Sequence, residues 1–106
     1  MFPTRSLLHA CRITLFSRSN CGLCTQAKGV LSDVWDKRPF DFKEIDLAEP
    51  ASKSWKDLYD FDIPVIHISK TDAAEEDVSV AGKAVKLMHR FTPEQVEAKM
   101  DQVSKE

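Results

Sequence analysis

The strongest constraint on the fold of this chain is a change in hydrophobic pattern around a pair of cysteines. Residues 12–17 (RITLFS) form a β-branched and aromatic run, which indicates a strand. After the cysteine pair, apolar residues recur every three or four positions over residues 23–35, which predicts a helix that must end before Pro39. Residues 40–47 then indicate a second strand. A strand, a helix and a strand of these lengths predict a right-handed parallel unit.

The rest of the chain predicts a second helix, a pair of strands and a third helix. Apolar positions over residues 51–59 indicate a short helix, and residues 64–69 (PVIHIS) are apolar enough for a strand inside a sheet. A long polar connection follows over residues 69–83, with a short strand expected at residues 78–80. Apolar residues alternate over residues 85–91, which predicts a fourth strand that adds an antiparallel edge to the sheet.

The last helix carries the clearest start signal in the chain. Thr92 stands at the N-cap position, Pro93 at the first helical position and Gln95 at the third, a pattern that predicts a capping box. Phe91 and Val96 are spaced for a hydrophobic staple. The expected element order is therefore β-α-β-α-β-β-α, and the fold class is α/β, with a mixed four-stranded sheet flanked by about three helices.

Length and composition limit the size of the protein and its partners. At 106 residues the chain is expected to form one domain and to act as a monomer, and its net charge of −2 provides no basic surface for nucleic acid. No apolar stretch approaches the roughly 18 residues of a membrane span. Three cysteines are too few for a secreted scaffold held by disulfides, so a reducing compartment, the cytoplasm, is expected.

The N-terminal residues differ in composition from the rest of the chain. The first acidic residue is Asp33, and the opening stretch MFPTRSLLHACR carries Arg5 and Arg12. Acid-free starts that contain arginine are typical of mitochondrial presequences, so the mitochondrion is the alternative location. The simpler interpretation is a flexible N-terminal segment over residues 1–11, followed by the folded domain over residues 12–106.

Cys21 and Cys24 lie where the first strand has ended and the first helix begins. A helix N-terminus favours an anion such as a thiolate, and cysteines in this setting have pKa values of roughly 3.5–7.5 against an ordinary 8.5. Arg18 adds positive charge in the same loop, and Ser19 or Asn20 is expected to cap the helix. Cys24 follows one helical turn later and is expected to lie deeper. These positions predict that Cys21 attacks and Cys24 resolves.

Three other interpretations of the cysteine pair remain open. A zinc site needs further ligands, and Cys11, His9 and His67 offer only arbitrary spacing. A structural disulfide is unusual in a reducing compartment. Two inert buried cysteines can also fall together by chance. Outside this pair, Cys11 is expected to be a bystander, and His67 to be a satisfied interior histidine rather than a catalytic base.

The motif CGLC after a first strand, followed by DIPVIH at residues 62–67, resembles the thioredoxin fold and, within it, glutaredoxin. The chain is similar to a small glutaredoxin-like family of eukaryotes and bacteria over about residues 12–102. The resemblance implies a thioredoxin/glutaredoxin-like fold with Cys21 as the nucleophile and Cys24 as the resolving thiol.

The same resemblance assigns substrate contacts. Arg18 falls where glutaredoxins often place a basic residue that meets a glutathione carboxylate. Ile63 corresponds to the residue whose backbone pairs with the substrate peptide, and Pro64 to a cis-proline beside the active site. Apart from the resemblance, Arg90 is a candidate second contact for an anion, and the alternative is a solvated side chain.

The chain departs from the glutaredoxin pattern at two places. Gly22 and Leu23 replace the usual Pro-Tyr between the cysteines. The stretch MHRFTPEQ stands where the family has a Gly-Gly turn whose backbone amides hold glutathione. Weak glutathione binding is therefore expected.

Together these patterns predict a thiol–disulfide oxidoreductase that needs no metal and no tightly bound organic cofactor. Its expected partners are protein disulfides and glutathione, the latter as a candidate co-substrate. An alternative from another class is a non-enzymatic module that binds an iron–sulfur cluster or a partner protein through Cys21. A third interpretation is an inactive domain kept for its surface.

Overall fold

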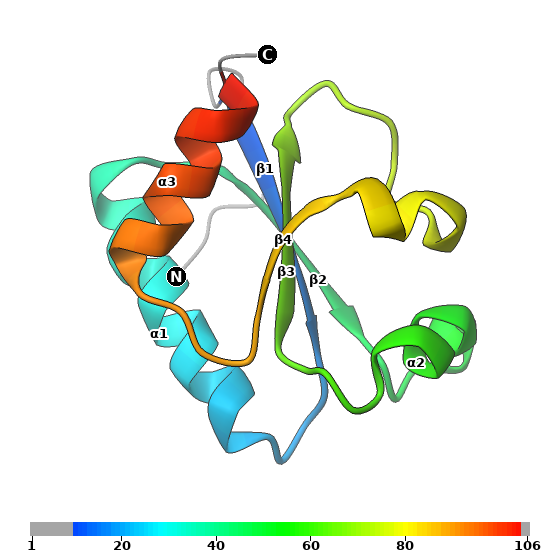
Figure 1. Cartoon of the computed structure of the whole chain (residues 1–106). Helices are drawn as coiled ribbons and strands as arrows, with labels where there is room; N and C mark the ends of the chain where they lie inside the picture. Colours follow the sequence, from blue (N-terminus) through cyan, green and yellow to red (C-terminus); the bar gives the residue numbers. More distant parts are fainter. Residues whose placement is uncertain (1–9, 105–106) are drawn as a thin grey trace.

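A four-stranded mixed sheet forms the centre of the molecule (Figure 1). The computed structural model describes residues 10–104. The strands lie in the order β2-β1-β3-β4, and β2 pairs parallel with β1, whereas β3 pairs antiparallel with β1 and with β4. Their bounds are Cys11–Ser17 for β1, Asp41–Asp46 for β2, Val65–Lys70 for β3 and Val85–Met88 for β4.

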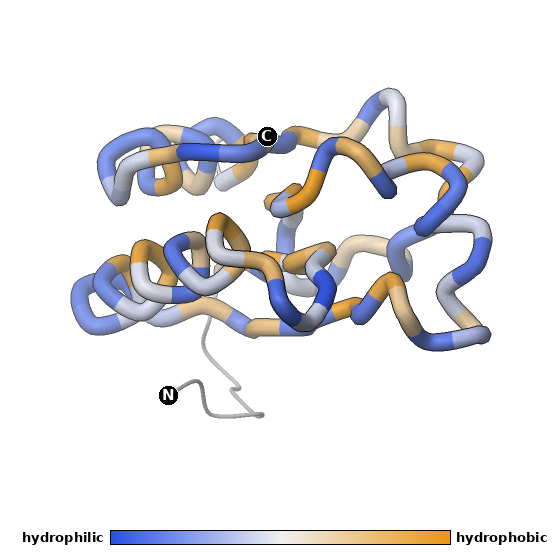
Figure 2. Tube along the Cα trace, turned by 90° about the horizontal axis from the view of Figure 1, so that it is seen from below, coloured by the Kyte–Doolittle hydropathy of each residue, from blue (hydrophilic) through white to orange (hydrophobic). Residues whose placement is uncertain are grey.

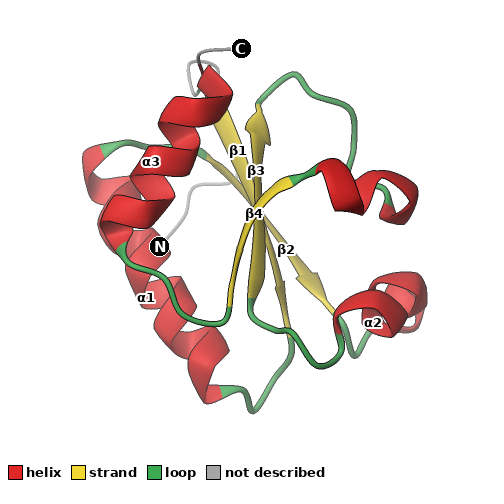
Figure 3. Cartoon of the chain, in the orientation of Figure 1, coloured by secondary structure: helices red, strands yellow, loops and turns green. Residues whose placement is uncertain are grey.

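Helices cover both faces of this sheet (Figure 1 and Figure 3). Helices α1 (Gly22–Lys37) and α3 (Pro93–Ser104) pack together on one face. The opposite face carries α2 (Lys53–Tyr59) and the short 3-10 helices η1 (Pro50–Ser52) and η2 (Val78–Lys83). Within residues 10–104, none of the helices is both long and apolar enough to cross a membrane.

Burial on both faces of the sheet explains the nearly continuous apolar run of β1. Ile13 and Leu15 are completely buried in one hydrophobic cluster with residues of α1 and α3. Phe16 is completely buried on the other face, where its ring contacts Trp55 and Tyr59 of α2. Apolar and polar residues alternate along both long helices, as expected for helices with one buried side (Figure 2).

The predicted element order and α/β fold class are confirmed. The capping box at the start of α3 is confirmed as well, because the Gln95 N–H donates to Thr92 Oγ1 at 3.1 Å and the Thr92 N–H donates to Gln95 Oε1 at 2.9 Å. These two hydrogen bonds satisfy backbone donors that the start of a helix would otherwise leave unpaired.

Two predicted strands differ from the structure by more than one residue at an end. The short strand expected at residues 78–80 is wrong, because this segment begins η2, where the Asp77 carboxylate accepts a hydrogen bond from the Ser79 N–H at 2.9 Å. The fourth strand ends at Met88 instead of residue 91. It ends there because His89 adopts a left-handed φ of 65°, which is incompatible with extended backbone.

The first strand begins at Cys11, one residue before its expected start. The Cys11 side chain is buried, and its Sγ lies 3.4 Å from Ser104 Oγ of α3. Residues 1–9, which hold most of the expected N-terminal segment, lie outside the described part of the chain. The domain boundary at residue 12 and the mitochondrial alternative therefore stay predictions.

Candidate active site

Cys21 caps the N-terminus of α1 with its own sulfur. Its backbone is extended, with φ −113° and ψ 108°, and its Sγ accepts a hydrogen bond from the Cys24 N–H at 3.1 Å. The sulfur thereby satisfies one of the N–H groups that a helix start leaves unpaired. The expectation that Ser19 or Asn20 caps this helix is wrong. Asn20 lies instead in the preceding turn, with a φ of 61°.

A disulfide joins Cys21 to Cys24, whose Cα atoms lie 5.2 Å apart. The two residues differ in exposure, because Cys24 is only 3% exposed whereas Cys21 is partly open to solvent. Helical geometry explains this difference, since Cys24 begins the buried stripe that continues through Ala27 and Leu31. An incoming disulfide therefore reaches Cys21 more readily than Cys24.

Three loops lie at the same end of the sheet as the cysteine pair. Residues 18–21 lead from β1 to α1, residues 60–64 lead from α2 to β3, and residues 89–92 lead from β4 to α3 (the lower end of the sheet in Figure 1). The register explains this placement. Phe16 at the end of β1 pairs with Val65 at the start of β3, and that start pairs with the end of β4.

Polar contacts tie the three loops to one another. The Arg18 guanidinium forms an ion pair with the Asp60 carboxylate, which joins the cysteine loop to the loop before β3. The His89 N–H donates to the Pro64 carbonyl at 2.7 Å, and His89 Nε2 lies 3.8 Å from Asp62 Oδ1. The loop before β3 is therefore joined to both of the other loops at the end of the sheet that carries the cysteine pair.

Each predicted substrate-contact residue lies in one of these loops. The Ile63–Pro64 peptide bond is cis, as the resemblance implies, and Pro64 is buried while Ile63 is half-buried. Arg18 is already paired with Asp60, which opposes its charge. Arg90 is exposed. It lines a hollow of about 100 Å³ with Gln26, Ala27, Val30, His89 and Phe91.

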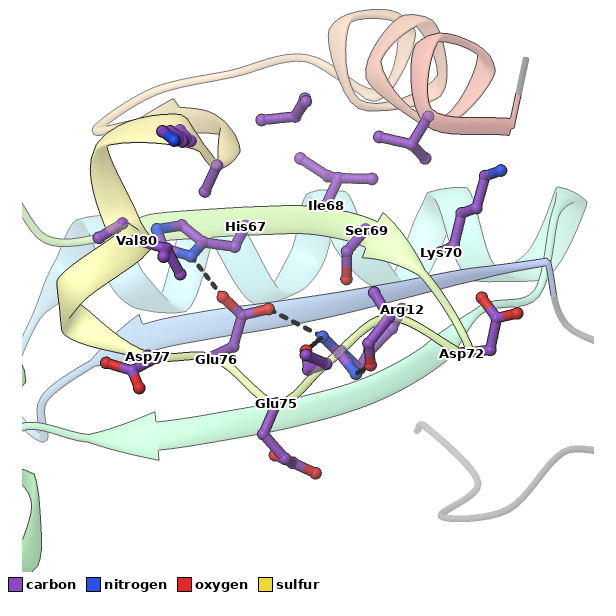
Figure 4. A pocket seen from close by; sticks show the side chains of 17 residues that line it. Arg12, His67, Ile68, Ser69, Lys70, Asp72, Glu75, Glu76, Asp77 and Val80 are labelled. Carbon is purple, nitrogen blue, oxygen red and sulfur yellow. Dashed lines mark hydrogen bonds and ion pairs between the residues drawn. The ribbon is translucent and has the colours of Figure 1, made fainter. Parts of the chain in front are cut away.

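A second polar cluster, which no sequence pattern signals, surrounds the buried His67 (Figure 4). Nδ1 of this histidine lies 2.7 Å from Glu76 Oε1, and Nε2 lies 2.7 Å from the Tyr59 hydroxyl. Glu76 Oε2 also accepts a hydrogen bond from the Arg12 guanidinium at 3.1 Å. These four residues, Arg12, Tyr59, His67 and Glu76, are called the His67 cluster below.

The side chains of the His67 cluster supply one another's hydrogen-bond partners, and two of them have shifted pKa values. Burial alone would raise the pKa of Glu76, but the hydrogen bonds and charges of His67 and Arg12 outweigh burial and hold that pKa below its ordinary value. Burial, aided by the negative charge of Glu76, raises the pKa of Tyr59. Both ring nitrogens of His67 have partners, so its interpretation as a satisfied interior histidine is confirmed.

A cavity of about 490 Å³ lies beside the His67 cluster, among residues of β3, of the connection 71–77 and of η2 (Figure 4). Arg12 lines this cavity near the start of β1, whereas the cysteine loop follows Ser17 at the opposite end of the strand. The cavity is therefore separate from the cysteine site. In the part of the chain that the structure describes, no group of three or more His, Cys, Asp or Glu residues could hold a metal ion.

Comparison with known proteins supports this picture of the fold and identifies a matching family. A family model described as a glutaredoxin-like domain (DUF836) matches residues 12–101. Chloroplastic thioredoxin z has a TM-score of 0.67 at 18% identity, over 92% of this chain and 80% of that chain. Thioredoxin O2 from Arabidopsis thaliana, solved in its oxidized state, has a TM-score of 0.61 at 14% identity, over 90% and 76%. Protein Ne2328 from Nitrosomonas europaea has a TM-score of 0.58 at 17% identity, over 89% and 94%.

These similarities and the geometry lead to a common conclusion. The solved structures are related to this chain by their thioredoxin-like fold, which matches the mixed four-stranded sheet and its flanking helices. In this fold the chain places two cysteines at disulfide distance on the first turn of a helix. The arrangement supports a redox function based on thiols.

Proposed function

The chain belongs to the glutaredoxin-like (DUF836) family, and on this basis we propose that it is a thiol–disulfide oxidoreductase with Cys21 as nucleophile and Cys24 as resolving thiol. The observation that carries the proposal is the N-cap position of Cys21. Its sulfur accepts the Cys24 N–H and lies at the positive end of the α1 dipole, and both features stabilise a thiolate there.

The proposed reaction has two steps. The Cys21 thiolate attacks one sulfur of a substrate disulfide, so that a mixed disulfide forms while the substrate S–S bond breaks and the released thiolate takes up a proton. Cys24 then loses its proton to solvent and attacks the Cys21 sulfur. This step forms the Cys21–Cys24 disulfide and releases the second substrate thiol, and two electrons have passed from the protein to the substrate.

We propose external thiols, with glutathione as the candidate, as the reductant that restores the dithiol. Two thiols supply the two electrons and leave as one disulfide. The turn that holds glutathione in glutaredoxins is replaced here by residues 89–92, and two of its amides are already engaged. The His89 N–H donates to Pro64 and the Thr92 N–H to Gln95. We therefore propose that glutathione serves as a weak co-substrate.

Single-cysteine variants test the proposal. Cys21→Ser should abolish reduction of a peptide disulfide, because no other thiol occupies the helix start. Cys24→Ser should accumulate a mixed disulfide between Cys21 and the substrate, visible by intact mass under non-reducing conditions. Cys11→Ser is the matched control, since Cys11 is buried in the sheet and should be dispensable for exchange.

Two outcomes would contradict this function. Full activity in Cys21→Ser would remove the nucleophile from the proposal. A purified protein that exchanges no disulfide, but gains visible absorption bands from thiolate-bound iron after anaerobic reconstitution, would favour binding of an iron–sulfur cluster instead.

A further inference from the structure

Phe61 is the most exposed large apolar side chain in residues 10–104. It is 94% exposed, compared with 43% for Leu58 and 53% for Val80. The phenylalanine lies in the turn between α2 and β3, three residues before the cis-proline Pro64. A ring left almost completely in water gains no stability from burial in the fold, and it is open to a partner that would cover it.

The turn that presents Phe61 is held in place on both sides of the ring. The Asp60 N–H donates to the Lys56 carbonyl at 2.9 Å, and the Asp62 N–H donates to the Tyr59 carbonyl at 2.8 Å. The side chains of these aspartates point to other loops: Asp60 pairs with Arg18, and Asp62 lies 3.8 Å from His89. Because these contacts already hold the turn, its backbone loses little conformational freedom when a partner covers the ring.

The same ion pair connects the turn of Phe61 to the loop that leads to Cys21. Arg18 belongs to the loop that carries Cys21, and its pairing with Asp60 joins that loop to the turn with the ring. The two segments that this ion pair joins carry Cys21 and Phe61, so a protein substrate bound at Cys21 can extend onto the turn that carries the ring.

We propose that Phe61 is a specificity-determining residue that favours protein disulfides flanked by an apolar side chain. This inference rests on the proposed function and names its substrate class. An apolar residue beside the substrate cysteine would cover the ring and remove both apolar surfaces from water. Glutathione is built from glutamate, cysteine and glycine, so it has no apolar side chain to offer.

Charge points to the same substrate class. Phe61 lies between two aspartates; Asp60 is opposed by Arg18, while Asp62 is 43% exposed and lies 3.8 Å from His89 Nε2. Glutathione carries two carboxylates and one amine, and its net negative charge is disfavoured beside Asp62. A neutral or basic segment of a protein carries no such penalty. The expected substrate is therefore a neutral or basic protein segment with an apolar residue beside its disulfide.

Matched peptide substrates test this proposal. Two neutral synthetic peptides, each a disulfide-linked dimer, differ only in having Leu or Ser next to the cysteine, and oxidised glutathione is the third substrate. The reduced full-length protein is mixed with each substrate, quenched with acid and analysed by intact mass to obtain a second-order rate constant. The wild-type protein should react about tenfold faster with the Leu peptide than with the Ser peptide.

Three substitutions then test whether the preference depends on an apolar side chain at position 61 rather than on exposed apolar surface elsewhere. Phe61→Ser should reduce the preference for Leu over Ser to less than about twofold and leave the rate with oxidised glutathione nearly unchanged. Phe61→Leu should keep most of the preference. Val80→Ser is the matched control, because it removes a half-exposed apolar side chain from η2, and it should keep the full preference.

The possible results distinguish this inference from the proposed function. An unchanged preference in Phe61→Ser, or equal losses with all three substrates, would overturn the role of Phe61 while leaving the oxidoreductase proposal intact. A wild-type protein that reacts with none of the substrates would overturn the proposed function itself. Sedimentation of both proteins adds one more test: a wild-type dimer that Phe61→Ser converts to a monomer would assign the ring to a second copy of the chain and contradict the inference.

Discussion

The cysteine end of the sheet and the His67 cluster are both built from polar or reactive side chains, but they differ in what their partners leave available. In the His67 cluster, both ring nitrogens, both Glu76 oxygens and the Tyr59 hydroxyl are engaged with one another or with Arg12. At the cysteine end, Cys21 is partly open to solvent and its sulfur partner, Cys24, lies within the same helical turn.

Because of this difference, we expect the His67 cluster to contribute to stability and the cysteine pair to contribute to reactivity. A buried polar group must find partners inside the protein, and the side chains of the His67 cluster find theirs in one another. The Cys21–Cys24 bond, in contrast, is one that an external thiolate can exchange without unpacking the core. The comparison therefore predicts that disturbing the His67 cluster changes stability, whereas disturbing the cysteine pair changes reactivity.

The largest effect is expected in the alkylation rates of the three thiols in the reduced protein. At about pH 6, iodoacetamide should modify Cys21 about a hundredfold faster than Cys24 or Cys11, because a helix-start thiol has a larger thiolate fraction and the other two are buried. Peptide mapping of partly modified protein measures the three rates. Preferential modification of Cys24 would reverse the roles assigned to the two active-site cysteines.

The next effect concerns stability and its dependence on pH. Glu76→Gln should lower the free energy of unfolding by about 1–3 kcal/mol at pH 7, because it removes a buried charge that bonds to His67 and Arg12. The folded-state pKa of Glu76 lies below its unfolded value. Its contribution is therefore complete above about pH 4.3 and disappears as the pH falls through the folded-state value. Urea unfolding at several pH values should show the gap between the two proteins closing in acid.

Glu75→Gln is the matched control for that measurement. It makes the same chemical change at the neighbouring position, where the carboxylate is exposed and pairs with Lys43 at the surface. Stability should hardly change, since exposed ion pairs contribute little. In both variants the alkylation rate of Cys21 should equal that of the wild-type protein. A slower rate in Glu76→Gln would show that the His67 cluster also affects the reactivity of Cys21.

The smallest effect is expected at the turn that replaces Gly-Gly. Turnover in a glutathione-coupled assay should be slow, and the double substitution His89→Gly and Arg90→Gly should raise it only about two- to twelvefold. Glycine frees the approach to the backbone, but one regained hydrogen bond contributes only about 0.5–1.5 kcal/mol. Brisk, saturable wild-type turnover at cellular glutathione concentrations would show that the substituted turn is no obstacle.

Elements whose signals are local could be predicted from the sequence. The capping box of α3 depends on Thr92 and Gln95, three residues apart, and the buried stripe of α1 depends on spacings of three and four. The positions of the two cysteines could be predicted as well, because the place of the pair between a strand and a helix determines which thiol lies at the helix start. Family resemblance, and not spacing, supplied the cis bond before Pro64.

Features that depend on tertiary contacts could not be predicted. Arg12 and Glu76 meet because residues 71–77 fold back over β3, and nothing in the acidic stretch DAAEED indicates that Glu76 turns inward while Glu75 faces solvent. The left-handed backbone at His89 was missed because glycine or asparagine is the usual signal for it. Cys21 was missed as a helix cap because the usual capping rules name oxygen-bearing side chains.

The short separation of the two bonded cysteines has a consequence for how the protein behaves as it cycles. A cross-link stabilises a protein mainly by restricting the unfolded chain, and this effect grows with the length of the loop that it closes. Here the bonded residues are only three apart in sequence. The oxidised and reduced molecules should therefore differ little in thermal stability. A carrier of this design can give up and regain its electron pair many times without alternating between a robust and a fragile form.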